Sequence, residues 1–301
     1  MNATIFVIQL NRNREKKGKI KMEKITSISY ELKEWLLNTL RSGVNPELLV
    51  DALIKKGFDP KFSYTLLFQM IRNQSIETIK ADQAPYQYEL PVLARKGNVF
   101  STSDREIKIT MKLEKPCIIL LDNFLSFQEC DELIDFSKTR LNRSQVIHSV
   151  TGERTTVPGR TSEGTEYAIG ENHLIKKIEK RIKEVTDYPV ENGESLQVLH
   201  YNKGEEYKPH YDFFPGNKID HTRGGQRVCT FLIYLNDVNE GGETIFPKID
   251  LKVSPKKGSA LYFHYGNGQG QTDRLSLHSS IPVIQGEKWI ATKWIRQGKI
   301  Y

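Results

Sequence analysis

The sequence predicts a mainly β fold, a jelly roll or sandwich with supporting helices, preceded by a small N-terminal α-helical bundle. Before about residue 80, apolar residues recur at three- and four-residue spacing, which is typical of helices. From Leu196 onward, short β-branched and aromatic runs alternate with turns rich in Gly, Asn and Pro, which favours many short strands. The runs that predict strands are LQVLHYN, YKPHYDFF, RVCTFLIYLN, ETIFP, LKVSP, SALYFHY, SIPVI and WIATKWI.

Composition indicates a globular chain of one or two domains, with 301 residues, 38% of them hydrophobic and 27% charged. No apolar run approaches the ~20 residues of a membrane-spanning helix, so we expect no membrane partner. The net charge is +7, but residues 1–21 hold six Lys and Arg against one Glu, a net of +5. The remaining 280 residues therefore carry only +2, and we expect no nucleic-acid partner.

The cysteine content predicts a reducing compartment. Cys117, Cys130 and Cys229 form an odd set with no close pair, and two of them lie in strand-like apolar runs. We expect reduced, mostly buried thiols and a cytoplasmic location.

Four segments follow one another along the chain. Residues 1–21 are a basic arm, either disordered or the product of a start assigned too early, with Met22 as the true first residue. Residues 22–80 form the helical segment, and residues 81–100 are polar and proline-containing, as expected of a linker. Residues 101–301 form the β domain.

The helical segment has clear start and stop signals. Asn45 and Pro46 supply an N-cap and a first-turn proline for a second helix, which Gly57 closes. A third, weaker helix begins at Asp59 or Pro60. This segment is either a recognition or docking module or a packing appendage that stabilises the β domain.

The β domain opens with strand-like alternation over residues 99–111 and a buried strand within CIILLDNFLS. Ser126 then caps a helix, and Asn172 to Val185 predict a second, charged helix. Between them, Gln145 to Gly164 predict a long mobile loop. We expect one face of each helix to be buried. The buried residues of the first helix would be Cys130, Leu133, Ile134 and Phe136. Those of the second helix would be Leu174, Ile175, Ile178 and Ile182.

His210, Asp212 and His278 predict a metal site. His210 and Asp212 lie two residues apart in a strand-like run, so both side chains can reach one ion. Two histidines and one carboxylate form the facial triad of non-haem Fe(II) oxygenases, which leaves coordination positions open. The HxD pair alone equally fits surface polar residues, but Lys288, ten residues after His278, adds a partner for the distal carboxylate of a 2-oxo diacid.

Four blocks, in this order, carry a resemblance to a known family: LHYNKGEEYKPHYDFF, GGQRVCTFLIYLNDVNEGGETIFP, VSPKKGSALYF and LHSSIPVIQGEKWIATKWIRQG. From about Asp104 to Tyr301 the chain resembles the prolyl 4-hydroxylases of the Fe(II)/2-oxoglutarate dioxygenase superfamily, in particular their small bacterial members. The resemblance implies a double-stranded β-helix with the metal at its mouth. It also implies Fe(II) as the metal, 2-oxoglutarate and O₂ as co-substrates and ascorbate as the reductant. The substrate would be a proline-containing peptide or protein, which is hydroxylated while succinate and CO₂ are released.

The resemblance also assigns further residues. Tyr201 and Thr244 would complete the co-substrate pocket with Lys288, although Thr244 could instead be a turn residue. Arg227 would hold the substrate backbone, and Tyr207 and Trp294 would line the peptide groove. Each of these last three residues could instead be a core-packing residue. The loop at 145–164 would cover the substrate.

Other readings stay open at this point. A 2-oxoglutarate hydroxylase could act on a free amino acid or another side chain, and a barrel could bind peptide or metal without catalysis. A complete triad together with Lys288 argues against the second alternative. Asp212, where a Gly or Ala would leave room for halide, argues for hydroxylation. An exposed edge strand could pair two copies into a homodimer.

Overall fold

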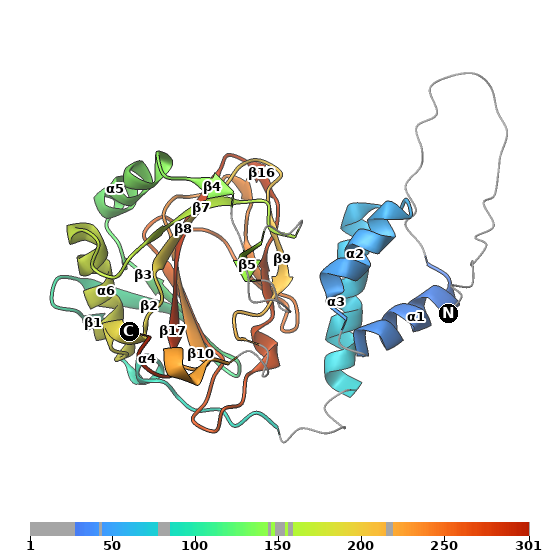
Figure 1. Cartoon of the computed structure of the whole chain (residues 1–301), viewed down its shortest axis with the longest axis horizontal. Helices are drawn as coiled ribbons and strands as arrows, with labels where there is room; N and C mark the ends of the chain where they lie inside the picture. Colours follow the sequence, from blue (N-terminus) through green and yellow to red (C-terminus); the bar gives the residue numbers. More distant parts are fainter. Residues whose placement is uncertain are drawn as a thin grey trace.

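A computed structural model gives the fold, and it describes residues 28–41, 44–77, 85–143, 146–147, 154–155, 159–214 and 219–300. The predicted basic arm at 1–21 and the choice between Met1 and Met22 lie outside these residues. Figure 1 shows a β domain and, beside it, three N-terminal helices that face strand β9. These helices are α1 (Tyr30–Arg41), α2 (Pro46–Lys55) and α3 (Pro60–Glu77). No described helix is both long enough and apolar enough to span a bilayer.

The β domain is built from antiparallel sheets, as the sequence predicts. The larger sheet has nine strands in the order β1-β2-β3-β14-β10-β17-β8-β7-β4. Their bounds are β1 (Val99–Ser101), β2 (Glu106–Glu114), β3 (Cys117–Asp122), β14 (Ala260–His264), β10 (Arg227–Tyr234), β17 (Lys288–Arg296), β8 (Leu196–Tyr201), β7 (Glu163–Tyr167) and β4 (Asn142–Arg143).

A four-stranded sheet lies against the larger one, in the order β13-β12-β15-β9. Its strands are β13 (Leu251–Val253), β12 (Thr244–Phe246), β15 (His278–Ser280) and β9 (Tyr207–His210). Two short pairs complete the strands: β11 (Glu240–Gly241) with β16 (Val283–Gln285), and β5 (Val146–Ile147) with β6 (Arg154–Thr155). The last pair lies within the predicted loop at 145–164, whose other residues up to 158 are outside the described ranges.

The larger sheet has an apolar core on each face. Strand β10 shows this directly, because alternate side chains on a strand point to opposite faces. Phe231 and Ile233 pack with the helices α5 (Phe127–Lys138) and α6 (His173–Thr186). Leu232 and Tyr234 pack on the other face with residues of the small sheet. The site described below lies between the two sheets.

Local signals fix the helix ends. Ser126 accepts a hydrogen bond from the Glu129 amide and its own amide donates to the Glu129 carboxylate, which is a capping box. Asn172, which we predicted to begin the charged helix, is the N-cap of α6. The prediction that Phe136 faces inward is wrong, since its side chain is exposed. Ser137 instead continues the buried stripe, and its hydroxyl bonds to the Leu133 carbonyl and the Tyr167 hydroxyl.

Residues 85–95, which we predicted to be linker, pack against the β domain. Leu93 of the short helix α4 (Val92–Arg95) is fully buried in the main core. Glu89 accepts from the Gly268 amide, and the Gln87 carbonyl accepts from Asn267. Of the predicted linker, residues 81–84 lie outside the described ranges.

The three N-terminal helices share a core of their own. Asn45 caps α2 through the Glu47 amide with Pro46 at the first helical position, and Gly57 follows that helix with φ +91°. The third helix, which we predicted to be weak, is the longest at 18 residues. Their shared core consists of Leu36, Leu49, Val50, Leu53, Phe58, Leu67 and Met70.

Short 3₁₀ turns complete the described elements, at Val190–Asn192, His221–Arg223 and Arg274–Ser276. All three cysteines are free and buried, as predicted.

Candidate metal centre

Three ligand side chains converge where two strands of the small sheet meet. His210 ends β9, His278 begins β15, and the register of the two strands pairs these residues directly. The Asp212 carboxylate lies between them, with Oδ1 3.6 Å from Nε2 of His210 and Oδ2 3.6 Å from Nε2 of His278. Candidate ligand atoms from all three lie within 4.8 Å of one another, close enough to hold one ion.

Backbone carbonyls orient both imidazole rings. Nδ1 of His210 lies 2.8 Å from the Lys208 carbonyl, and Nδ1 of His278 lies 3.0 Å from the Ser276 carbonyl. A carbonyl can only accept, so each Nδ1 carries the hydrogen and each Nε2 presents a lone pair to the centre. Burial, reinforced by His278, lowers the pKa of His210 to about 3. The ring is therefore neutral, which is the form that binds a metal ion.

Asp212 is held by a tertiary contact rather than by strand periodicity. Strand β9 ends at His210, so the alternation that we used to align the two side chains does not extend to Asp212. The Thr230 hydroxyl donates to Oδ2 of Asp212 at 2.6 Å. Burial would raise the pKa of Asp212, but His278, His210 and Arg227 hold it below its ordinary value. Sequence reasoning missed Thr230, whose only signal was a hydroxyl inside the apolar run RVCTFLIY.

A pocket between the two sheets contains these ligands and most of the other predicted site residues. Tyr201, Tyr207, Thr244, Lys288 and Trp294 all line it. Arg227 does not. The remaining lining residues are Arg160, Leu199, Thr230, Leu232, Ser279, Ser280, Ile290 and Thr292, together with the three ligands.

Lys288 is a buried lysine that forms no hydrogen bond with a carboxylate of the described residues. It begins β17 directly opposite Tyr201 of β8, and its side chain is fully buried. Nζ donates to the Ser280 hydroxyl at 2.7 Å. Burial lowers the pKa of Lys288 to about 7, although the more distant Glu243 acts to raise it. A carboxylate entering the pocket would meet this ammonium group in a site with little solvent.

Arg227, which does not line the pocket, bonds to Glu194 and to the backbone of Asp212. It forms a two-pronged ion pair with Glu194, both bonds 2.7 Å long, and donates to the Asp212 carbonyl at 3.1 Å. Its guanidinium carbon lies 4.1 Å from the centre of the Trp294 ring. Burial would raise the pKa of Glu194, but Arg227 and Arg296 hold it below its usual value. Arg227 thus supports the backbone of a ligand residue, and its contact with substrate stays a prediction.

Tyr207 lies directly against the centre. Its ring stacks on His210 with the centroids 3.6 Å apart and the planes 19° apart. The guanidinium carbon of Arg160 lies 5.0 Å from the Tyr207 ring centre. Tyr207 therefore fixes the orientation of one ligand as well as lining the pocket.

The donor set fits Fe(II) with a 2-oxo acid. Two neutral imidazoles and one carboxylate are the ligands of the facial triad, which leaves positions open for further ligands. Among the described residues that line the pocket, Ser279 and Trp294 each have a buried polar atom, Oγ and Nε1, without a hydrogen-bond partner. Buried polar groups are almost always paired, so these atoms indicate a pocket built for a polar ligand.

Comparison with known proteins agrees with this geometry. The family model of the 2OG-Fe(II) oxygenase superfamily matches residues 196–296. Probable prolyl 4-hydroxylase 10 of Arabidopsis thaliana is 41% identical over 223 residues, which span 68% of this chain and 76% of that protein. The chain belongs to the prolyl 4-hydroxylase family. The resemblance on which the sequence analysis relied is thereby confirmed.

Other known proteins are also similar to this chain. Prolyl 4-hydroxylase 5 of Arabidopsis thaliana is 41% identical over 199 residues, 60% of this chain and 68% of that protein. Among solved structures, a viral collagen prolyl hydroxylase from Paramecium bursaria Chlorella virus-1 is 32% identical with a TM-score of 0.49. That match covers 60% of this chain and 95% of the viral chain.

Proposed function

We propose that this prolyl 4-hydroxylase family member is an Fe(II)- and 2-oxoglutarate-dependent dioxygenase that hydroxylates proline within a peptide or protein. The observation that carries the proposal is one pocket that contains both the His210–Asp212–His278 cluster and the buried Lys288. His210, Asp212 and His278 would hold Fe(II). The bound metal would supply O₂ activation coupled to oxidative decarboxylation, so that 2-oxoglutarate, O₂ and prolyl peptide yield succinate, CO₂ and hydroxyprolyl peptide.

The chain's own residues bind and orient the reactants. Lys288 would pair with the distal carboxylate of 2-oxoglutarate, and Tyr201 would contribute its hydroxyl beside it. The Thr244 hydroxyl accepts from Tyr234 at 2.8 Å, so its own hydrogen is available to a ligand oxygen. Apolar Leu232 and Ile290, which line the same pocket, would exclude water around the co-substrate.

The substrate side is formed by aromatic groups and one cation. The indole N–H of Trp294 can donate to a peptide carbonyl, and Tyr207 offers a flat surface to a proline ring. Extended polyproline II segments dock on such aromatic surfaces. Arg227 would reach substrate backbone by adjusting its pairing with Glu194.

Several finer assignments belong to this proposal. We infer that the two facing sheets form the double-stranded β-helix of the family, with residues 22–80 as a separate helical unit. Ascorbate would keep the metal reduced during turnover. A homodimer and a cytoplasmic location stay predictions.

A turnover assay by mass spectrometry tests the proposal. Purified protein is mixed with Fe(II), ascorbate, 2-oxoglutarate and proline-rich peptides, and succinate and added peptide oxygen are measured. His210→Ala and Lys288→Ala serve as site variants, and Lys138→Ala, in an exposed ion pair of α5, serves as the control. We expect one oxygen on proline for each succinate in wild type and control, and neither product in the site variants. Iron binding with no succinate under any condition would contradict the proposal.

A further inference from the structure

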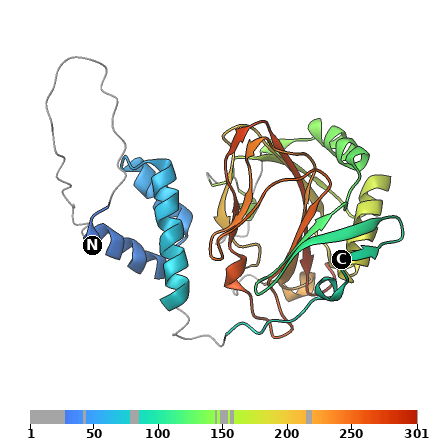
Figure 2. The ribbon, with the colours of Figure 1, turned by 180° about the vertical axis from the view of Figure 1, so that it is seen from behind.

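The N-terminal helices cover one side of the strand that ends in His210. Strand β9 is the last strand of the small sheet, with β15 on one side of it. On its other side the described residues form no further strand pairing, but an isolated bridge joins Tyr207 to Arg160. Figure 2 shows α2 and α3 facing the β domain at this position. An edge strand of four residues has few hydrogen bonds to hold it, so neighbouring contacts can determine its position.

Two polar contacts join the helices to this strand. Asp51 of α2 pairs with Nζ of Lys208 at 2.5 Å, and the side chain of Lys208 is only 6% exposed. Tyr64 of α3 donates its hydroxyl to the Glu206 carboxylate at 2.7 Å. Nζ of Lys208 also lies 5.7 Å from the centre of the Tyr64 ring. Because Lys208 is buried, loss of its partner would leave a poorly solvated charge.

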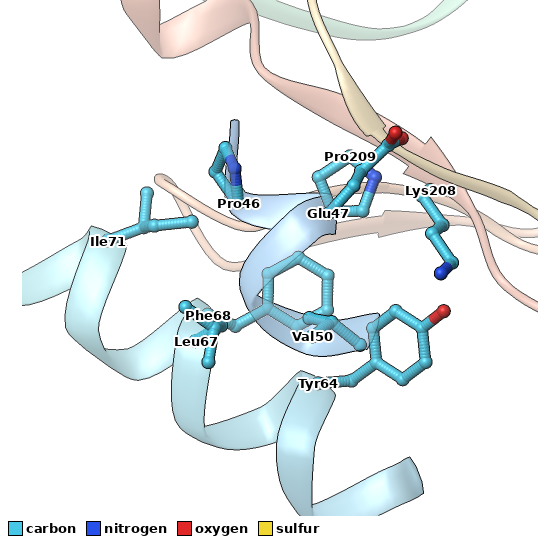
Figure 3. Close-up of a pocket in the computed structure, with 9 residues that line it drawn as sticks. All are labelled: Pro46, Glu47, Val50, Tyr64, Leu67, Phe68, Ile71, Lys208 and Pro209. Atoms are coloured by element: carbon cyan, nitrogen blue, oxygen red, sulfur yellow. The ribbon is translucent and has the colours of Figure 1, made fainter. Parts of the chain in front are cut away.

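Apolar side chains seal the same interface. Figure 3 shows a small cavity in which Pro209 of β9 faces Val50 of α2 and Leu67 of α3. Helix α2 also approaches the segment beside β9, where a Cβ added to Gly159 would lie 2.7 Å from a Glu47 carboxylate oxygen. The Gly159 carbonyl in turn accepts from the Lys208 amide at 3.0 Å. The helices thus contact both β9 and the adjacent Gly159, whose neighbour Arg160 bridges to β9.

The contacted residues are those that orient the metal ligand. The Lys208 carbonyl accepts from Nδ1 of His210, and Tyr207, between Glu206 and Lys208, stacks on the His210 ring. Groups that hold a ligand's second ring nitrogen set both its tautomer and its direction. We propose that α2 and α3 position His210 for metal binding, with Asp51 and Tyr64 as positioning residues. The inference rests on the proposed function, because it requires that His210 bind the metal.

The test measures metal affinity rather than turnover. Co(II) is titrated into the full-length protein without substrate, and its visible absorption gives the dissociation constant. In Asp51→Lys, two ammonium groups replace the ion pair, and we expect binding about tenfold weaker, since loss of groups that orient a ligand costs about 10–100-fold in affinity. The double variant Asp51→Lys with Lys208→Asp restores the pair with reversed charges and should recover most of that loss. The rate of amide hydrogen exchange in residues 205–210 should rise in the single variant and return to the wild-type rate in the double variant.

Two further variants separate the possible outcomes. Asp135→Lys, in an exposed ion pair of α5, is the matched charge control and should bind Co(II) as wild type does. Tyr64→Phe, which deletes one hydroxyl, should weaken binding a fewfold. If Asp51→Lys lowers the unfolding temperature but binds Co(II) with wild-type affinity, the helices are a packing appendage and the inference is overturned. His210→Ala tests the metal site itself, and equal Co(II) binding by that variant and wild type would overturn the proposed function and this inference together.

Discussion

The two faces of strand β17 carry two buried lysines in different surroundings. Lys288 and Lys293 lie five residues apart, so alternation along the strand turns them to opposite sides of the sheet. Lys293 meets Glu179 of α6 at 2.5 Å, with both side chains almost fully buried. Lys288 faces the pocket and bonds to the neutral hydroxyl of Ser280. Burial lowers the pKa of both lysines.

This difference supports the proposal that Lys293 has a structural role and that Lys288 binds a ligand. On the helix side the chain itself provides the compensating carboxylate, which completes an ion pair within the fold. On the pocket side, no carboxylate from the part of the chain that the structure describes bonds to the ammonium group, and a bound dicarboxylate would complete the pair. Substitutions at the two positions should therefore affect different properties of the protein, and the following experiments test that separation.

Lys293→Met should have the largest effect, and on stability. It leaves the Glu179 carboxylate buried without its cation, which should lower the free energy of unfolding by about 3–5 kcal/mol. Urea denaturation measures this change. The double variant Lys293→Met with Glu179→Leu replaces both charges by apolar groups and should recover most of the loss. A wild-type unfolding free energy in the single variant would show that the pair is not structural.

Lys288→Met should instead affect the binding of 2-oxoglutarate. Removing one member of a buried charge pair costs about 2–5 kcal/mol, so the dissociation constant should rise about 30-fold or more. Calorimetric titration of 2-oxoglutarate into the Co(II)-loaded protein measures it. The free energy of unfolding should stay constant or increase, because the free protein no longer buries an ammonium group. If the variant bound 2-oxoglutarate with unchanged affinity but had a lower free energy of unfolding, Lys288 would have a structural role like that of Lys293.

The pH dependence of 2-oxoglutarate binding should follow Lys288. Its pKa is about 7 in the free protein, and a bound carboxylate would raise that pKa. Binding then needs the protonated lysine, so affinity is constant well below pH 7 and falls as the pH rises above it, about fivefold between pH 7 and pH 8. Titrations from pH 6 to 9 measure this slope. Lys288→Met should give a flat profile, and a wild-type profile as flat as that of the variant would contradict the assignment.

Thr230→Val should have a smaller effect than either lysine substitution. It removes the 2.6 Å hydrogen bond to Asp212 while keeping the shape of the side chain, and Co(II) affinity should fall about tenfold. Thr230→Ser keeps the hydroxyl and should bind metal like wild type. Equal weakening in both variants would mean that packing, rather than the hydrogen bond, supports Asp212.

Signals that lie close together in the sequence predicted much of the fold. The caps at Asn45 and Ser126 were predicted because a helix end is determined by a few neighbouring residues. The short runs of β-branched and aromatic residues predicted many short strands, because this pattern also lies within a few neighbouring residues. Phe136 was predicted on the wrong side of its helix, because a stripe read from apolar residues alone overlooks a buried serine whose partner, Tyr167, lies thirty residues away.

The residues of the candidate site could be proposed from the sequence, but their supporting contacts could not. Spacing and the four family blocks pointed to His210, Asp212, His278 and Lys288, which the structure brings together in one pocket. The Thr230 bond to Asp212 and the Arg227 pair with Glu194 span 18 and 33 residues, and no local pattern marks them. They depend on which strands become neighbours.

By itself, the sequence determined which chemical groups the protein has and the local conformation near each of them. Only the tertiary structure decided which groups meet. The pairing of β9 with β15 sets the two histidines opposite one another, and the approach of α2 sets Asp51, 157 residues away in sequence, beside Lys208. Such contacts form because distant apolar surfaces pack together, and the register of that packing depends on the whole core at once.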